Sequence, residues 1–330
     1  MLSDSQGRSG TARCLGPRCE PVRPGPRESS PLLAGRESEQ APIRSLLTRL
    51  SLKKTTGTDL ILCWPRGHGK ADLLKWALRK ARARRINTID HSSAAISPID
   101  TALARRAWRR PLIVAVDEAH TPAIAAGRAL LQAVQRLQRM RLPVMLLLAG
   151  TQDLPRHLNS MEASFWGGTR IVPMGLLESD TAADAIQIPL VAEGRSMTAD
   201  APEQVVAESH GYAFFLQVWG SVLWNEWPDA ARPLPHGDVN RIRPRLASAR
   251  GQCYIQRYDE LNRADLAFVV TKLSMAFFET TRPTRREVDA IIKSALEGQR
   301  RAADRESVIA ARDRLHDPGY IWSVCEESRQ

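Results

Sequence analysis

The sequence predicts an α/β protein built on a parallel sheet, and two observations support this fold class. Short, mainly apolar runs stand at 59–63, 85–89, 111–116, 143–149 and 170–174. Runs with little polar alternation suit strands that are buried on both faces, as in a parallel sheet covered by helices. Between these runs, stretches 70–83 and 125–140 have apolar residues at three- and four-residue spacing. That period predicts the amphipathic helices that connect one parallel strand to the next.

The segments before and after this core differ from it in composition. Residues 1–34 are rich in Gly, Pro, Ser and Arg without an apolar period, so we expect a disordered N-terminal arm before a core at 35–176. Residues 177–237 lose the strand signal and predict a small helical unit, which ends in a proline-rich stretch.

Residues 238–330 predict a second α-rich unit. Helical patterns stand at 263–278 and 284–296, and a third begins at 303 before a short hairpin-like end. Three helices followed by a β-wing are the parts of a winged helix-turn-helix. The expected organisation is therefore an arm, an α/β core, a helical lid and a winged-helix domain.

Composition limits the compartment and the partners. The formal net charge is +11, with 47 Lys and Arg against 36 Asp and Glu, which favours a polyanionic partner such as DNA; a generally basic proteome is the alternative. No apolar run approaches the ~20 residues that span a bilayer, so no membrane association is expected. Five scattered cysteines and no apolar signal core predict a cytoplasmic protein.

The stretch "CWPRGHGKAD" at 63–72 is similar to the phosphate-binding loop G-x-x-x-x-G-K-[ST], with two departures. Gly67, Gly69 and Lys70 remain where amides wrap a phosphate and an ammonium reaches the terminal phosphates. Trp64 replaces the first glycine, and Ala71 replaces the hydroxyl that ligates Mg²⁺. We expect ATP or ADP binding to survive better than hydrolysis; a structural glycine turn is the alternative. The nucleotide-binding candidates in this loop are Pro65, Arg66, Gly67, His68, Gly69, Lys70 and Ala71.

A second nucleotide signal is "LIVAVDEAH" at 112–120, which places two carboxylates at the carboxyl end of a buried strand. Ligands bind at that end of open α/β sheets. Asp117 is expected to hold Mg²⁺ through water, and Glu118 to orient and deprotonate an attacking water. The alternative is that Asp117 merely begins a helix.

Five segments, "GRESEQAPIRSLL", "PRGHGK", "LIVAVDEAH", "LLLAGTQDL" and "ESHGYAFFLQVWG", follow one another in an order that resembles bacterial ATP-binding proteins of the AAA+ superfamily. Within it they resemble origin-recognition-like initiators and the related STAND-type and transposon-associated ATPases. The likeness runs from about Gly35 to the C-terminus and implies a P-loop core, a helical lid and a winged helix. Ala213 stands where the similar "GYPYFLQ" helix start has proline, and no sensor-two arginine is found there.

The resemblance implies further roles. Arg36 and Glu37 match a "GRE" box beside the adenine, and Thr151 falls at the polar sensor of the γ-phosphate. Arg170 falls where related proteins carry an arginine finger that contacts the nucleotide of a neighbouring subunit, which implies a homo-oligomer. Glu118, Thr151 and Arg170 are therefore the catalytic candidates.

The third helix of the C-terminal unit, roughly 303–315, is the candidate DNA-reading element. In a winged helix it enters the major groove, here with Arg305, Arg312 and Arg314, while 317–322 forms the wing. Because acidic residues alternate with these arginines, a solvated helix face is the alternative, and winged helices also bind proteins.

Two basic runs, 79–85 and 105–110, also suit a phosphate backbone, with Trp108 able to stack on a base. Each alone is more typical of an exposed helix end.

The function that these features favour is an ATP-controlled switch that binds DNA, with weak or absent hydrolysis. One alternative is a STAND-like regulatory or defence ATPase whose C-terminal domain binds a protein. A second alternative is a nucleotide-binding scaffold that does not hydrolyse ATP.

Overall fold

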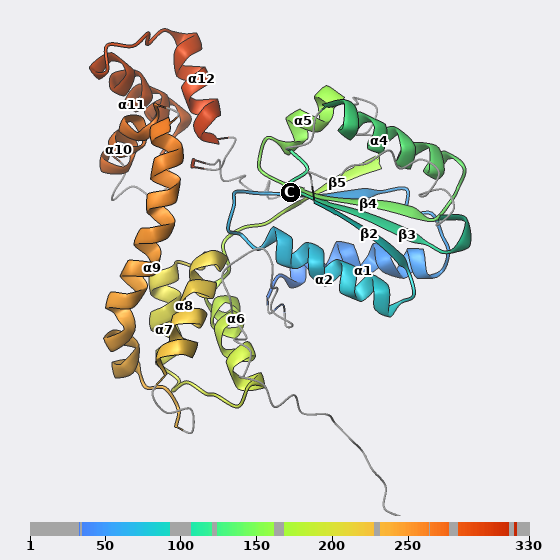
Figure 1. Ribbon diagram of the computed structural model, residues 1–330, viewed down its shortest axis with the longest axis horizontal. Coiled ribbons are helices and arrows are strands. Elements are labelled where there is room, and N and C mark those ends of the chain that lie inside the picture. Colours follow the sequence, from blue (N-terminus) through green and yellow to red (C-terminus); the bar gives the residue numbers. More distant parts are fainter. Residues whose placement is uncertain are drawn as a thin grey trace, which may run out of the picture.

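The computed structural model confirms an α/β core joined to two groups of helices (Figure 1). The structure describes residues 33, 35–92, 107–120, 124–161, 168–227, 232–263, 265–276, 283–316 and 320–321. Apart from Leu33, the expected arm at 1–34 lies outside the described residues.

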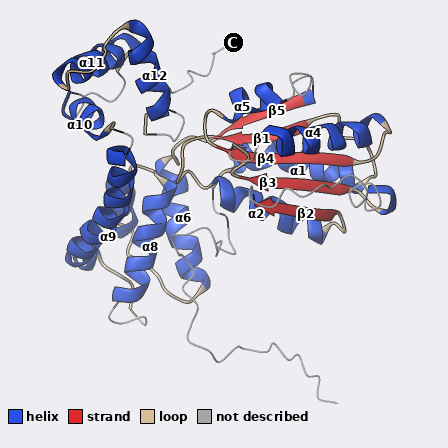
Figure 2. Cartoon of the chain, turned by 45° about the horizontal axis from the view of Figure 1, so that its top comes forward, coloured by secondary structure: helices blue, strands red, loops and turns tan. Residues whose placement is uncertain are grey.

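The core sheet has five parallel strands in the order β2-β3-β4-β1-β5 (Figure 2). Their bounds are β1 Asp59–Cys63, β2 Asn87–Ser92, β3 Leu112–Asp117, β4 Val144–Gly150 and β5 Thr169–Pro173. The prediction of β1 is correct at both ends, and the other strands begin within two residues of the predicted position. Only β2 extends more than one residue beyond its predicted end, because its last residues, Asp90, His91 and Ser92, are polar.

Helices cover both faces of this sheet and create two separate cores (Figure 1). Helices α1 (Glu37–Ser51) and α2 (Lys70–Ala83) pack on one face, and α4 (Ile124–Arg139) and α5 (Leu154–Met161) pack on the other. Successive strand residues alternate between the cores: Leu60 and Leu62 face α1 and α2, whereas Ile61 faces α4. A strand buried on both faces therefore needs an apolar residue at every position, which is the pattern of β1 and β4.

The parallel arrangement gives the sheet two unlike edges. All strands end at the carboxyl edge, where β1 leads into 64–71 and β3 ends in Asp117. Because β4 lies between β1 and β3, the residue after β4, Thr151, falls between those two segments. The strands begin at the opposite, amino edge, where α1, α2 and α4 end.

The first group of helices forms the lid, at the lower left of Figure 1. It contains α6 (Ser179–Ala192), α7 (Ala201–Ser209), α8 (Ala213–Glu226) and the beginning of α9 (His236–Arg263). Trp219 of α8 is fully buried in its core, against residues such as Ile186 and Leu223.

Helix α9 runs for 28 residues, and most of it was not predicted as a helix. The expected domain boundary between 237 and 238 falls in its first turn. Val239 and Ile242 pack in the lid core, whereas Leu261, near the other end, packs in the core of the C-terminal helices. One helix therefore connects both helical units.

The C-terminal unit contains α10 (Ala267–Ala276), α11 (Arg285–Gly298) and α12 (Arg305–His316). The third predicted helix corresponds to α12. Only Tyr320 and Ile321 of the expected wing at 317–322 are among the described residues, and both pack on the core of these helices. The winged helix therefore stays a prediction.

Among the described helices, none combines the length and the apolar character that crossing a bilayer requires.

Asp59 gives a prediction about pH and stability. Its buried carboxylate accepts hydrogen bonds from the Leu146 amide (2.7 Å) and from Gln138 Nε2 (3.0 and 3.1 Å), yet burial raises its pKa to about 6. Because the pKa is higher folded than unfolded, the stabilisation is complete below about pH 4 and is lost as the pH rises through 6. Asp59→Asn should therefore raise the free energy of unfolding at pH 7 by about 2 to 3 kcal/mol.

Urea denaturation of both proteins between pH 3.5 and 7 checks this. At pH 3.5 the wild-type carboxyl is itself neutral, so the two curves should meet there and serve as the control. A difference that stays constant across this range would contradict the assignment of the proton to Asp59.

Candidate functional site

The loop between β1 and α2 has the backbone that a phosphate-binding turn needs. Gly67 and Gly69 adopt left-handed conformations, with φ of 84° and 86°. Gly69 is the N-cap of α2 and supplies no side-chain cap, so the first amides of α2 have no capping side chain. Trp64 has no positive φ and packs against the core. A side chain is therefore accommodated without backbone strain at the position where the motif has its first glycine.

Lys70, the first residue of α2, is held inside this loop. Its ammonium donates hydrogen bonds to the carbonyl oxygens of Trp64 (2.6 Å) and Pro65 (2.7 Å). Burial lowers the pKa of Lys70 to about 8, and the nearby Asp117 carboxylate partly offsets that effect. Ala71, the next residue, presents a methyl group at the position where the motif has a Ser or Thr hydroxyl.

The two carboxylates after β3 occupy different environments. Asp117 is the last residue of the strand and does not begin a helix. Burial raises the pKa of Asp117, while a hydrogen bond from the Glu118 amide to Oδ1 (2.9 Å) lowers it. Glu118 is exposed and left-handed, with φ of 49°. The strained turn directs the Glu118 side chain to solvent beside the buried Asp117.

Thr151 is buried at the end of β4, and its hydroxyl is hydrogen-bonded to the Asp153 carboxylate. Its amide donates to His120 Nδ1 at 3.4 Å, which joins the segment after β4 to the segment after β3. Burial lowers the pKa of His120, so the ring is held neutral as an acceptor. His120 was not among the predicted site residues, although it stands two residues after Glu118.

Arg36 joins the start of α1 to the phosphate-binding loop. It is the left-handed N-cap of α1, buried, and its guanidinium donates to the His68 carbonyl at 3.0 Å. Its carboxylate partner is Glu39, at 2.8 Å, whereas Glu37, the other residue of the expected box, is exposed. Burial lowers the pKa of His68 to about 4, so this ring is neutral beside two cations.

The lid touches the loop directly. The Tyr212 hydroxyl donates to the Arg66 carbonyl at 2.6 Å, and the Phe214 amide donates to the Gly67 carbonyl at 2.9 Å. A Cβ at Gly67 would lie 2.1 Å from Tyr212 Oη, so this approach requires glycine. Gln217, one turn into α8, donates to Asp72 of α2 at 2.8 Å. Tyr212 and Gln217 lie within the quoted "GYAFFLQ" stretch, but their partners lie about 145 residues away, where sequence spacing gives no signal.

Arg170 is not brought to this edge. It lies inside β5, opposite Leu60 of β1, near the amino edge of the sheet. Its exposed side chain is separated from its own phosphate-binding loop by the length of β1.

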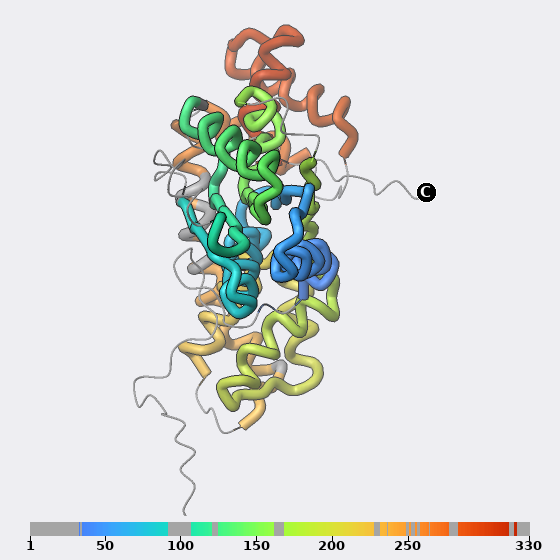
Figure 3. The backbone as a smooth tube through the Cα atoms, turned by 90° about the vertical axis from the view of Figure 1, so that its right-hand side faces the viewer, coloured from blue at the N-terminus to red at the C-terminus, as the bar shows by residue number. Residues whose placement is uncertain are grey.

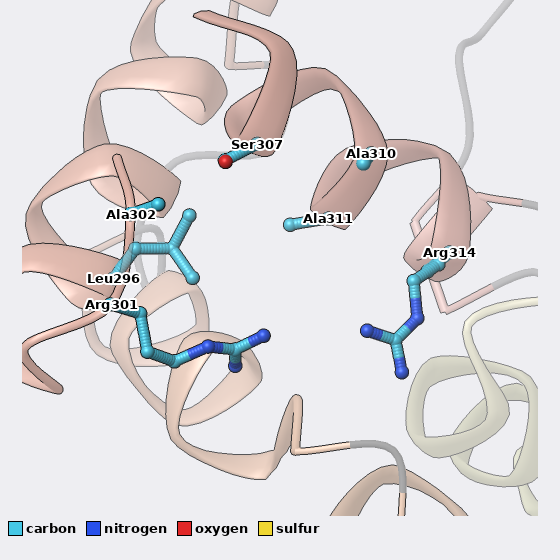
Figure 4. A pocket seen from close by; sticks show the side chains of 7 residues that line it. All are labelled: Leu296, Arg301, Ala302, Ser307, Ala310, Ala311 and Arg314. Atoms are coloured by element: carbon cyan, nitrogen blue, oxygen red, sulfur yellow. The ribbon is translucent and has the colours of Figure 1, made fainter. Parts of the chain in front are cut away.

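The three candidate DNA-reading arginines of α12 differ in environment. Arg305 is exposed. The Arg312 side chain is only 12% exposed, and one of its nitrogens donates to both carboxylate oxygens of Asp289 at 2.8 Å, so it joins α12 to α11. Arg314 is exposed and, with Arg301, lines a cavity of about 190 Å³ with an apolar floor (Figure 4). Arg305 and Arg314 therefore remain candidates, whereas Arg312 is committed to an internal ion pair.

Comparison with solved structures places this fold among known ones. A Walker-type ATPase of Pyrococcus abyssi is similar at a TM-score of 0.60 and 17% identity, over 89% of this chain and 92% of that chain. The RuvB Holliday junction branch migration motor of Thermotoga maritima is similar at 0.51 and 15%, over 83% and 85%. No protein-family model matches the chain, and no curated protein matches its sequence. The likeness shows that the chain shares the fold of these two ATP-dependent proteins and nothing further about its role.

Proposed function

We propose that this chain is an ATP-binding switch of the AAA+ type that acts on DNA and hydrolyses ATP weakly or not at all. One observation carries the proposal: the half-buried Lys70 and Asp117 and the buried Thr151 stand at the carboxyl edge of three adjacent strands, and the lid is hydrogen-bonded to the loop that leads to Lys70. The Lys70 ammonium donates to two backbone carbonyls, and the Asp117 carboxylate offsets its desolvation only in part, so a further anionic partner would stabilise it. Phosphates are the partner that this loop geometry suits.

The residues present fit a magnesium nucleotide in part. The loop amides around Gly67 and Gly69 and the Lys70 ammonium would bind the phosphates, and Arg36 would lie beside the base. Bound Mg²⁺ supplies charge neutralisation on the phosphates. Asp117 would hold it through water, whereas Ala71 gives no ligand, which weakens metal binding. Glu118 would orient and deprotonate a water, and Thr151 would sense the terminal phosphate.

The lid is the element that reads the bound state. Because Tyr212 and Phe214 are bonded to the carbonyls of Arg66 and Gly67, any movement of the loop on phosphate binding moves the start of α8. Helix α8 packs on α9, and α9 continues into the C-terminal unit, where Arg305 and Arg314 would contact DNA. An ordered two-state element of this kind is what a nucleotide switch requires.

Calorimetric titration of ATP and ADP with Mg²⁺ into the full chain tests the nucleotide site. Lys70→Ala should weaken ATP binding at least about tenfold, because one charge-assisted phosphate contact is lost. Wild-type affinity should fall as the pH rises through 8, where Lys70 loses its proton, whereas Lys70→Arg should keep its affinity up to pH 9. Equal heats for wild type and Lys70→Ala would exclude this loop as the site.

Phosphate release from the same samples decides whether the switch turns over. Release that disappears in Glu118→Gln would show that water replaces the missing hydroxyl and that the enzyme is active. Arg170 reaches only a nucleotide on a neighbouring copy, so Arg170→Ala would then lower release and leave ATP binding unchanged. No release from wild type would agree with a binding switch.

A second candidate function, a protein-binding regulatory module, is favoured by exposed apolar side chains on α10. Phe268 (39% exposed) and Met275 (72% exposed) lie on one face of the helix, seven residues apart. This candidate predicts no salt-dependent DNA affinity, whereas a DNA-binding surface gives a steep salt dependence. If the chain is only a scaffold, Lys70→Ala will leave partner binding unchanged.

A further inference from the structure

The amino edge of the sheet, opposite the nucleotide site, gathers positive charge. In Figure 1 the lid lies at the left and the strands begin at the right, and Figure 3 views the molecule from that side. Exposed lysines and arginines stand in 49–54, 80–85, 109–110 and 136–141. These segments are the ends of α1, α2 and α4 and the approach to β3, so the topology places them together.

Acidic residues are almost absent from the described stretches of this edge. The stretches 49–59, 79–89, 105–116 and 136–152 contain a single carboxylate, Asp59, which is buried. By contrast, Asp72, Asp117, Glu118 and Asp153 gather at the carboxyl edge. The hydrogen bonds of Arg49 to the Thr55 carbonyl, and of Arg82 to the Thr88 hydroxyl, leave both cations with neutral partners in those bonds. The described stretches of this edge therefore carry many more cations than carboxylates.

Backbone pairing aligns part of this charge in a row. The Asn87 amide donates to Pro111 O at 2.8 Å, and the Leu112 amide donates to Pro143 O at 2.9 Å, so β2, β3 and β4 begin side by side. Arg85, Arg110 and Arg141 precede the first residues of these strands by two or three residues. Neighbouring strands are about 4.8 Å apart, so the row suits a chain of regularly spaced anions.

Three helix ends at this edge carry a cation where glycine is usual. Lys53, Arg85 and Arg141 follow α1, α2 and α4 in left-handed conformations, with φ of 55°, 58° and 59°. In each case the next amide closes the helix at 3.1 Å, in the pairs Lys54 to Arg49 O, Ile86 to Ala81 O and Leu142 to Leu137 O. Helix α6 closes in the same way with Gly194. Glycine is preferred at such positions because it has no Cβ, so Lys53, Arg85 and Arg141 each occupy a backbone conformation that is unfavourable for their residue type.

The helix dipole explains only part of the pattern. A cation at a helix C-terminus is favourable, which accounts for one or two residues on each helix. It does not account for Arg109 and Arg110, which precede a strand, or for the left-handed cations. Like charges at this density repel one another, which favours an external polyanion.

Trp108 indicates the kind of polyanion. Its side chain is 65% exposed, and it directly precedes Arg109 and Arg110, which lead into β3. Exposed aromatic rings among cations stack on unpaired bases, whereas duplex DNA offers its stacked bases to no such ring. We propose that the amino edge binds single-stranded nucleic acid, with phosphates along the arginine row and a base on Trp108. This surface is distinct from the nucleotide site and from α12.

Fluorescence anisotropy with a labelled 20-nucleotide oligothymidine and a 20-base-pair duplex tests the proposal on the full chain, between 50 and 200 mM salt. Arg85→Gly and Arg141→Gly should each weaken single-strand binding roughly fivefold at 0.1 M salt and reduce the salt slope by about 0.7. Glycine suits these backbone positions, so Tm should stay level or rise by about 1 to 3 °C. Lost binding therefore does not come from unfolding.

Arg300→Gly is the matched control. Arg300 follows α11 with φ of 56°, and the next amide closes that helix onto Leu296 O at 2.9 Å. The Arg300→Gly substitution removes one positive charge from the same left-handed backbone geometry, at a helix end outside the amino edge. Single-strand binding should therefore stay unchanged. Equal losses in Arg300→Gly and Arg85→Gly would show a general charge effect and overturn the proposal.

Trp108→Ala tests the stacked base. Single-strand affinity should fall at least about fivefold, and duplex affinity should not change. Tighter duplex binding together with no effect of Trp108→Ala would overturn the single-strand assignment. A loss caused by Arg305→Gln and Arg314→Gln but not by Arg85→Gly would place the contact on α12, which overturns this proposal and leaves the proposed switch intact.

Discussion

Replacing Gly211 by alanine should lower the free energy of unfolding by at least about 3 kcal/mol and separate the lid from the phosphate-binding loop. Gly211 has φ of 69°, and an added Cβ would lie 2.1 Å from the Leu177 carbonyl oxygen. The Leu177 amide also donates to Gly211 O at 2.8 Å, so the obstacle is hydrogen-bonded backbone that cannot rotate away. Left-handed strain of about 1 to 2 kcal/mol adds to the loss of this bond.

Urea denaturation and ATP titration measure the two effects. Gly194→Ala is the control, because Gly194 also has positive φ (77°) but an added Cβ would meet nothing within 4 Å. It should show the left-handed strain alone, about 1 kcal/mol, and unchanged ATP affinity. Equal destabilisation by both substitutions would refute the role given to the Leu177 contact.

Trp219→Ala should destabilise the lid by about 3 to 5 kcal/mol, because Trp219 has the largest fully buried side chain among the described residues. The ring fills the space between α6 and α8, and no smaller residue there restores the packing. Since α8 begins beside the loop, ATP binding should weaken in the same variant.

Trp219→Phe separates size from polarity. The buried Trp219 Nε1 has no hydrogen-bond partner, so replacing indole by phenyl removes an unsatisfied donor. This variant should lose only about 1 to 2 kcal/mol in urea denaturation. A loss as large as that of Trp219→Ala would mean that the indole nitrogen has a stabilising role.

The sequence predicted the sheet well because strands buried on both faces must be apolar at nearly every position, as β1 and β4 are. It missed most of α9 because the buried residues described for that helix lie in its first half and near its last residue, while Ile255 and Tyr258 between them are exposed. An apolar period predicts a helix that buries one continuous face, and it does not predict a helix that buries two short, separate faces.

The candidate site was predicted where a motif lies within one segment. Lys70 was predicted from the loop after β1, and Asp117 was predicted from the end of β3. The contacts of Tyr212 and Gln217 depend on how the lid sits on the core, which no local pattern encodes. The Arg36–Glu39 pair was not predicted; it forms because residues three apart on a helix face each other, whereas Arg36 and the adjacent Glu37 do not.

The continuity of α9 has a mechanical consequence. A helix of 28 residues is about 42 Å long, and one end is embedded in the lid while the other carries α10 to α12. It therefore acts as a lever arm: a lid rotation of about 10° displaces its far tip by roughly 7 Å, about the spacing of two stacked base pairs. In the proposed switch, a small movement of the loop on phosphate binding would thus become a displacement on the scale of a nucleic-acid repeat.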